Sequence, residues 1–242
     1  MKFFSSDTVL AFISDASIDF TPADFDLPLS KDQQTYLKAQ TGIDIPQVFW
    51  RKQVHGDDVI EIRGHTPNSK NELGVCPLIS ACPDADAFVT NQINLPIAIR
   101  TADCVPVFIF DPVKRVIGLA HAGWKGTHKQ IAAKTVKTMQ DKFDCRCYDL
   151  QVVLGPAIRR CCYQVTKEFR EYFSKDVAER GGHLYVDIIA ANQRQLVEAG
   201  VPAGHISDSG QCTCCNKAFF SFRRDGDTSG RMISLMMLCT NT

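Results

Sequence analysis

Three residues of the chain combine metal-binding side chains with small neighbours. His55 lies in 53–56 (QVHG), Cys104 in 101–106 (TADCVP), and His121 in 120–124 (AHAGW). Two imidazoles and one thiolate can fill three positions of a tetrahedral zinc ion and leave the fourth open, whereas structural zinc sites fill all four. The residue types therefore predict a catalytic metal centre. Zn²⁺ is the expected ion, and Cu²⁺ is possible because it binds such donors with higher affinity.

The spacing of the three residues is too long for a local metal motif. Residues 55 and 104 are 49 positions apart, and 104 and 121 are 17 apart, so only the fold could bring them together. The alternative is that Cys104 is a buried thiol and His121 a hydrogen-bonded core histidine. The small residues around His121 in 120–126 (AHAGWKG) permit close approach of a ligand or backbone, which favours a site.

The pattern of apolar residues predicts the elements that must position these side chains. Nearly continuous apolar runs indicate buried strands, and apolar residues at helical spacing indicate amphipathic helices. Cys104 precedes one run and His121 follows the next, so neighbouring strands would bring them to one sheet edge, where open α/β sheets bind ligands. Expected strands cover 9–13, 47–53, 58–63, 87–90, 95–101, 105–110, 116–120, 150–154, 218–222 and 232–238, and expected helices cover 30–41, 126–143, 166–180 and 187–199, with a long loop at 64–83.

Composition narrows the class of protein. The 242 residues are 45% hydrophobic and carry 27 basic and 27 acidic side chains, which is ordinary globular usage without a basic excess for nucleic acid or lipid. No apolar run is long enough to span a membrane, and Asp7 and Asp15 interrupt a possible signal peptide. We therefore expect a cytoplasmic protein with reduced thiols and with neither nucleic acid nor a membrane as partner.

The eleven cysteines are an odd count, which argues against a disulfide framework. Cys161-Cys162 and the 212–215 segment (CTCC) suggest a second metal cluster, but they lack the paired C-x-x-C arrangement of structural zinc sites. Free thiols are the preferred interpretation at this stage.

Six motifs occur in a fixed order along the chain. They are 53–56 (QVHG), 84–90 (DADAFVT), 101–107 (TADCVPV), 120–126 (AHAGWKG), 154–158 (LGPAI) and 219–225 (FFSFRRD). This series resembles the YfiH-like family, also called the multicopper polyphenol oxidase-type laccase or peptidoglycan editing factor family. The resemblance covers roughly 47–238, whereas 1–46 lack the Gly-Gly and Asn-Leu-Gly segments with which the family usually opens.

The resemblance implies a fold and an activity. The expected fold is a three-layer α/β/α-type single domain over 1–242 with a mixed central sheet. The expected activity is that of a zinc-dependent purine nucleoside phosphorylase that cleaves adenosine, inosine or methylthioadenosine and also deaminates adenosine, with metal ligands at His55, Cys104 and His121. The laccase name fits poorly, because the chain lacks His-x-His pairs and a blue-copper ligand set.

A phosphorolytic site also needs cations near its phosphate. Arg223 and Arg224 are candidates, since a guanidinium group matches phosphate oxygens in geometry. If 218–222 and the residues beyond form a strand, neighbouring side chains alternate between faces, and Arg224 is slightly favoured as the pocket residue. The alternative places both arginines in surface ion pairs with Asp225 and Asp227. Asp103 could orient a ligand, accept a proton or only cap a turn.

Two other functions remain open at this stage. Cys104 could be the nucleophile of a metal-free Cys–His hydrolase, with His121 as its base and a peptidoglycan precursor as substrate. The chain could also be a non-catalytic small-ligand binding module. The sequence does not determine the preferred nucleoside or the oligomeric state.

Overall fold

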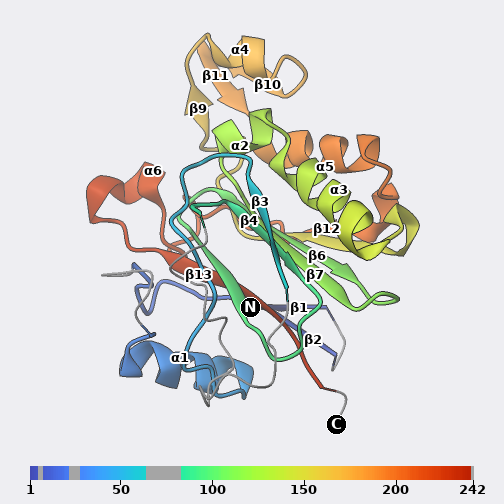
Figure 1. The fold of residues 1–242 in the computed structure, drawn as a ribbon. Coiled ribbons are helices and arrows are strands. Elements are labelled where there is room, and N and C mark those ends of the chain that lie inside the picture. Colours follow the sequence, from blue (N-terminus) through green and yellow to red (C-terminus); the bar gives the residue numbers. More distant parts are fainter. Residues whose placement is uncertain (5–7, 22–27, 64–82, 241–242) are drawn as a thin grey trace.

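Two β-sheets pack face to face in the computed structural model, which describes residues 1–4, 8–21, 28–63 and 83–240 (Figure 1). The loop expected at 64–83 lies almost wholly outside the described residues. Most of the apolar runs expected to be strands are strands, and they divide between the two sheets. Cys104 lies where the chain passes from one sheet to the other.

The larger sheet has six strands and mixed direction. The strands in spatial order are β12 (Ile206–Asp208), β8 (Gln151–Leu154), β6 (Val105–Asp111), β7 (Val116–Ala122), β4 (Ala87–Thr90) and β3 (Val59–Ile62). The β6–β7 hairpin, which begins directly after Cys104 and contains His121, lies at the centre. The pairs β3–β4 and β8–β12 are parallel, and the other neighbours are antiparallel.

The smaller sheet has four antiparallel strands, in the order β1 (Lys2–Phe3), β2 (Val9–Ile13), β13 (Met232–Leu238) and β5 (Ile97–Thr101). One face of this sheet packs against the six-stranded sheet through a shared core that includes Phe88, Phe108 and Ile99. The segment 102–104 connects β5 of one sheet to β6 of the other.

Helices cover the outer faces of both sheets. Helices α3 (Ile131–Phe143) and α5 (Ile188–Glu198) pack on the six-stranded sheet, and α1 (Lys31–Thr41) packs on the four-stranded sheet. Figure 1 shows α1 far from α3 and α5, with the sheets between them. The α/β class and the mixed sheet are confirmed. The second sheet adds a layer to the expected three, because a strand buried on both faces reads the same whether a helix or a sheet covers it.

The expected helix at 166–180 is wrong. Only a short helix, α4 (Phe169–Tyr172), forms there. The strand before it, β9 (Gln164–Val165), and the two after it, β10 (Val177–Arg180) and β11 (His183–Val186), form a three-stranded sheet in the order β10, β11, β9. Gly181 and Gly182, which the sequence suggested as a helix end, have φ values of 58° and 76°. Two consecutive residues with positive φ form the tight hairpin turn that joins β10 to β11.

Three other expected elements also differ. The helix expected at 126–143 is divided into α2 (Trp124–His128) and α3, because Gln130 adopts a left-handed φ of 64°. Segment 47–53 forms a single β-bridge at Phe49 in place of a strand. Segment 218–222 is not a strand either, since Ser221 caps the short helix α6 (Phe222–Asp225) by accepting from the Arg224 N–H. Within the described ranges, no helix has the length and apolar character to cross a membrane.

Candidate metal centre and pocket

The structure brings His55, Cys104 and His121 together. One ligand atom from each lies within 4.8 Å of those of the other two, and the imidazole ring centroids are 4.8 Å apart. His121 is part of β7, Cys104 immediately precedes β6, and His55 lies in the segment that leads to β3. His121 is 3% exposed, Cys104 is half-buried and His55 is exposed, so the group opens to solvent on one side.

Asp86 holds two of these residues in place. Its buried carboxylate lies 2.7 Å from His121 Nδ1 and accepts the backbone N–H groups of Val54, His55 and Gly56 at 2.7–3.1 Å. Because Nδ1 is engaged by Asp86, His121 presents Nε2 to a ligand. A carboxylate behind a metal-binding histidine fixes the ring and increases its basicity.

The backbone around the three residues is specialised. His55 has a φ of 56° and Asp103 a φ of 89°, which are left-handed values that non-glycine residues rarely adopt. Gly123 lies close against the group, since a Cβ there would lie 3.0 Å from both Cys104 Sγ and His55 Nδ1, and these side chains would have to move by a few tenths of an ångström to accommodate it. Strained conformations of this kind persist where the surrounding contacts impose them.

Cys104 and His121 shift each other's pKa. Burial disfavours the Cys104 thiolate, but the imidazoles of His121 and His55 outweigh it and lower the pKa of Cys104 to about 6. Burial likewise disfavours protonated His121, yet the Cys104 thiolate and Asp86 raise the His121 pKa to about 9. The side chains alone therefore form a thiolate–imidazolium pair, and the thiolate is the form of cysteine that binds metals.

A pocket of about 540 Å³ opens directly over this group. Its size lies within the range of small-molecule sites. Four cationic side chains line it, namely Arg100, Lys125, Arg223 and Arg231, together with the aromatic rings of Trp124, Tyr163 and Phe222. The pocket thus combines a metal-binding group, positive charge and flat apolar surfaces.

The structure distinguishes the two candidate arginines. Arg223 lines the pocket, where its guanidinium lies 5.3 Å from the centre of the Tyr163 ring and donates to the Gln164 carbonyl. Arg224 points away from the pocket and binds the Asp225 carboxylate and the carbonyls of Thr213, Cys214 and Phe219. The preference for Arg224 is therefore wrong, because it assumed strand alternation where the chain forms α6.

Asp103 lies at the edge of the pocket with both carboxylate oxygens engaged. One accepts the Thr213 hydroxyl and the other the Arg223 backbone N–H, each at 2.6 Å. Asp103 therefore fixes the start of α6 and with it the position of Arg223.

Comparison with models of protein families shows the family to which the chain belongs. Residues 29–239 match the family model described as multi-copper polyphenol oxidoreductase laccase. The chain belongs to this family, which is the YfiH-like family. The match begins at residue 29, within the segment 1–46 that lacks the usual opening motifs.

Several members of the YfiH-like family are similar in sequence. The chain is 35% identical over 195 residues to purine nucleoside phosphorylase YlmD of Geobacillus stearothermophilus, an alignment that covers 76% of this chain and 70% of YlmD. It is 34% identical over 214 residues to adenosine deaminase RL5 of an unknown prokaryotic organism, covering 83% of this chain and 78% of RL5.

Solved structures of YfiH-like proteins share the fold. YlmD from Geobacillus stearothermophilus superimposes with a TM-score of 0.79 at 29% identity, over 97% of this chain and 93% of YlmD. The YfiH protein of Bacillus licheniformis gives a TM-score of 0.78 at 28% identity, over 95% and 92%.

Sequence reasoning missed Asp86 and Tyr163 as components of the site. Asp86 was visible only as part of the 84–90 motif, although an acidic residue within an apolar run is itself a sign of a buried role. Tyr163 could not be found from the pattern, because it belongs to a loop that reaches the pocket only through the three-dimensional fold.

Proposed function

We propose that the chain is a zinc-dependent purine nucleoside phosphorylase that also deaminates adenosine, acting as one catalytic domain in the cytoplasm. The observation that carries the proposal is the convergence of His55, Cys104 and His121 beneath a pocket rich in cations and aromatic rings. The enzyme names of the similar family members, purine nucleoside phosphorylase and adenosine deaminase, support it.

The donor set fits a catalytic zinc ion. Two imidazole nitrogens and one thiolate match the ligands of zinc sites that keep a position for water or substrate. Asp86 supplies the carboxylate that commonly supports a metal-binding histidine. When bound, the zinc would act as a Lewis acid and lower the pKa of a coordinated water. Copper, the metal in the family's name, is the alternative ion, because it binds such donors with higher affinity.

The cations of the pocket fit a phosphate co-substrate. The Arg223 guanidinium donates to the Gln164 carbonyl, and the Arg223 backbone N–H donates to Asp103. Lys125, which also lines the pocket, places its ammonium 5.6 Å from the Trp124 ring centre. In phosphorolysis, a phosphate oxygen forms a bond to the ribose C1′ while the bond from C1′ to the base nitrogen breaks. The base leaves with that electron pair and takes up a proton.

The aromatic residues fit a purine base. Tyr163, Trp124 and Phe222 all line the pocket, and Phe222 is 48% exposed there. Aromatic faces bind nucleobases by stacking and tolerate different bases. This tolerance agrees with a substrate range of adenosine, inosine and methylthioadenosine.

A product assay tests the proposal. Purified protein of measured metal content is incubated with each nucleoside, with and without phosphate, and the products are separated. We expect adenine or hypoxanthine to appear only with phosphate, and inosine to form from adenosine without it. If no nucleoside yields a free base or a deaminated nucleoside, while a small ligand still raises the melting temperature, the chain is a binding module and the proposal fails.

The thiolate–imidazolium pair of Cys104 and His121 favours one second candidate. Such a pair is the nucleophile and acid of Cys–His hydrolases, and a peptidoglycan precursor would be the expected substrate. Metal analysis separates the two candidates. Activity that follows zinc content and is lost on chelation supports the phosphorylase, whereas full activity without metal, abolished by alkylation of Cys104 alone, supports the hydrolase.

A further inference from the structure

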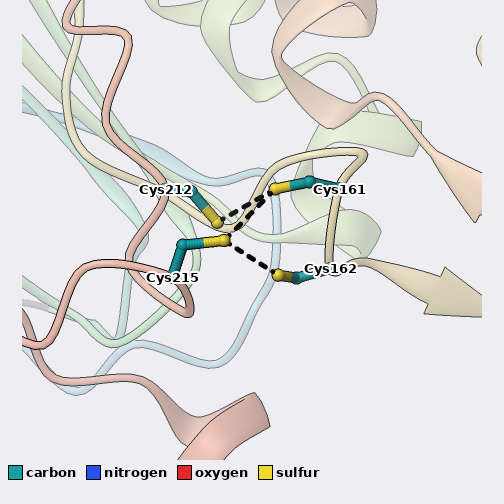
Figure 2. A group of neighbouring side chains, drawn as sticks. All are labelled: Cys161, Cys162, Cys212 and Cys215. Atoms are coloured by element: carbon teal, nitrogen blue, oxygen red, sulfur yellow. Dashed lines mark hydrogen bonds between the residues drawn. The ribbon is translucent and has the colours of Figure 1, made fainter.

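Four cysteines outside the pocket form a second cluster. The sulfurs of Cys161, Cys162, Cys212 and Cys215 lie within 4.8 Å of one another and point toward a common centre (Figure 2). The Cys162–Cys215, Cys161–Cys212 and Cys161–Cys215 pairs are 3.2, 3.5 and 3.6 Å apart. Four thiolates about 2.3 Å from a tetrahedral zinc ion would lie about 3.8 Å from one another, so small side-chain movements would accommodate the ion.

The backbone of the cluster resembles that of a thiolate metal site. Cys212 and Cys215 form one C-x-x-C pair, and the backbone N–H groups of Cys215 and Arg159 are directed at the Cys212 sulfur. The adjacent residues Cys161 and Cys162 supply the other half. The sequence suggests this combination as a metal cluster, but the preference for free thiols rested on the absence of a second C-x-x-C pair.

The two halves come from loops that are already joined by the backbone. Ala157 forms a parallel β-bridge with Cys212, and the Thr213 N–H donates to the Ala157 carbonyl at 3.1 Å. These bonds fix the spacing of the two loops before any metal binds.

The surroundings suit a charged metal–thiolate group. Zinc with four thiolates carries a net charge of −2, and a surface hollow beside Cys161 is lined by three arginines and one carboxylate, namely Arg159, Arg160, Arg180 and Asp187. Arg159 is itself paired with Asp208, and the excess of positive charge remains. The Arg180 guanidinium donates to the Cys161 carbonyl at 3.0 Å. Cys161 and Cys215 are exposed, which gives the ion a path from solvent.

We propose that Cys161, Cys162, Cys212 and Cys215 bind a second, structural zinc ion, distinct from the centre in the pocket. Four sulfur ligands leave no open position, so this ion would not take part in the reaction. Each thiol releases its proton to solvent as its thiolate binds the metal.

The second ion would stabilise the wall of the pocket. The loop that contains Cys161 and Cys162 also carries Ile158 and Tyr163, and the loop that contains Cys212 and Cys215 leads to Phe222 and Arg223. A zinc ion held by both loops would therefore connect two sides of the proposed nucleoside site without touching the substrate.

Metal counting tests the proposal. Protein is produced with added zinc, purified anaerobically with a phosphine reductant, and analysed for zinc per chain. We expect two equivalents in the unaltered protein, and one in Cys162→Ser, in Cys215→Ser and in Cys104→Ala. Combining Cys104→Ala with Cys215→Ser should leave none. Cys214→Ser is the matched control, because the Cys214 side chain contacts Cys162 but is not one of the four that gather as a group, and it should keep two equivalents.

Cobalt binding identifies the ligands in a protein that keeps all four cysteines of the cluster. In the Cys104→Ala protein, Co²⁺ added after zinc removal should give the intense sulfur-to-metal charge-transfer and visible bands of a four-thiolate tetrahedral site. The proposal is overturned if the Cys104→Ala protein binds no zinc, if it shows no such cobalt bands, or if Cys214→Ser loses zinc as Cys215→Ser does. A Cys162–Cys215 disulfide in the reduced preparation, found by peptide mapping, would overturn it as well. If only the pocket failed to bind metal, the four cysteines would still hold one zinc ion. Failure of the proposed activity can therefore be distinguished from failure of the proposed cysteine site.

Discussion

The carboxylate of Asp86 lies 2.7 Å from Nδ1 of His121 and also accepts three backbone N–H groups from the segment that contains His55. A single buried side chain thus orients one candidate metal ligand through its ring and another through its backbone. Asp86 does not need to touch a substrate to control the geometry of the pocket.

Replacing Asp86 tests this relationship. Asp86→Asn places an amide where four donors require acceptors, so we expect zinc affinity at the pocket to fall about 10- to 100-fold. Unsatisfied donors should also reduce the free energy of unfolding by about 2 kcal/mol. Competitive chelator titration and chemical denaturation measure the two effects.

Asp84→Asn is the matched control, since Asp84 belongs to the same motif but is exposed. It should leave both quantities within error of the unaltered protein. Equal metal affinity in the two variants would contradict the role assigned to Asp86.

Arg223 and Arg224 should differ in what they control. Arg223→Ala removes a pocket cation, and loss of one charged hydrogen bond of about 1.5–3 kcal/mol predicts a roughly 10- to 100-fold lower kcat/KM for phosphate. Arg224→Ala removes bonds to three carbonyls and Asp225, so its main effect should be a lower melting temperature. Steady-state kinetics with varied phosphate and thermal denaturation distinguish the two, and the reverse pattern would show that the assignment of the arginines is wrong.

The reactivity of Cys104 should report its ionisation. With the metal removed, iodoacetamide labelling of Cys104 should rise with pH around a midpoint near 6, because the pKa of this thiol is lowered to about 6 and only the thiolate reacts. His121→Ala removes the main cationic partner and should move the midpoint upward. Peptide mass spectrometry of labelled protein gives the rate at each pH. A midpoint near that of ordinary cysteine, about 8.5, would contradict the coupling.

The ion pair of Asp208 and Arg159 predicts a pH dependence of stability. Burial raises the pKa of Asp208, but the two bonds from Arg159 outweigh it and lower the pKa below its usual value. A carboxylate whose pKa is lowered by folding stabilises the protein above its unfolded pKa, and this contribution disappears as the pH falls through the folded pKa. Asp208→Asn should therefore lower the melting temperature at pH 7 and pH 5.

The difference between Asp208→Asn and the unaltered protein should shrink steadily below pH 4, where the unfolded carboxyl becomes protonated. Thermal denaturation at several pH values checks this trend. Asp225→Asn serves as a comparison, since its carboxylate also pairs with an arginine but lies on a more exposed surface. A difference independent of pH down to strongly acidic conditions would contradict the electrostatic origin.

The sequence predicts the metal-binding residues of the pocket better than it predicts the short elements around them. His55, Cys104 and His121 can be selected from residue type and local composition, and the buried strands around them from continuous apolar runs. The pair Gly181-Gly182 was misleading, because glycine both ends helices and forms hairpin turns, and only pairing with β11 decides between them. The orientation of Arg223 depended on α6, which is too short to have a periodic pattern.

The position of β13 has a consequence for how the protein is made. This strand lies between β2 and β5, and the Ile233 N–H donates to the Ser14 hydroxyl across 219 residues of chain. During translation, β2 and β5 emerge from the ribosome long before the strand that separates them. Until then the nascent polypeptide presents two unpaired, apolar edges, which are the surfaces that chaperones protect from aggregation.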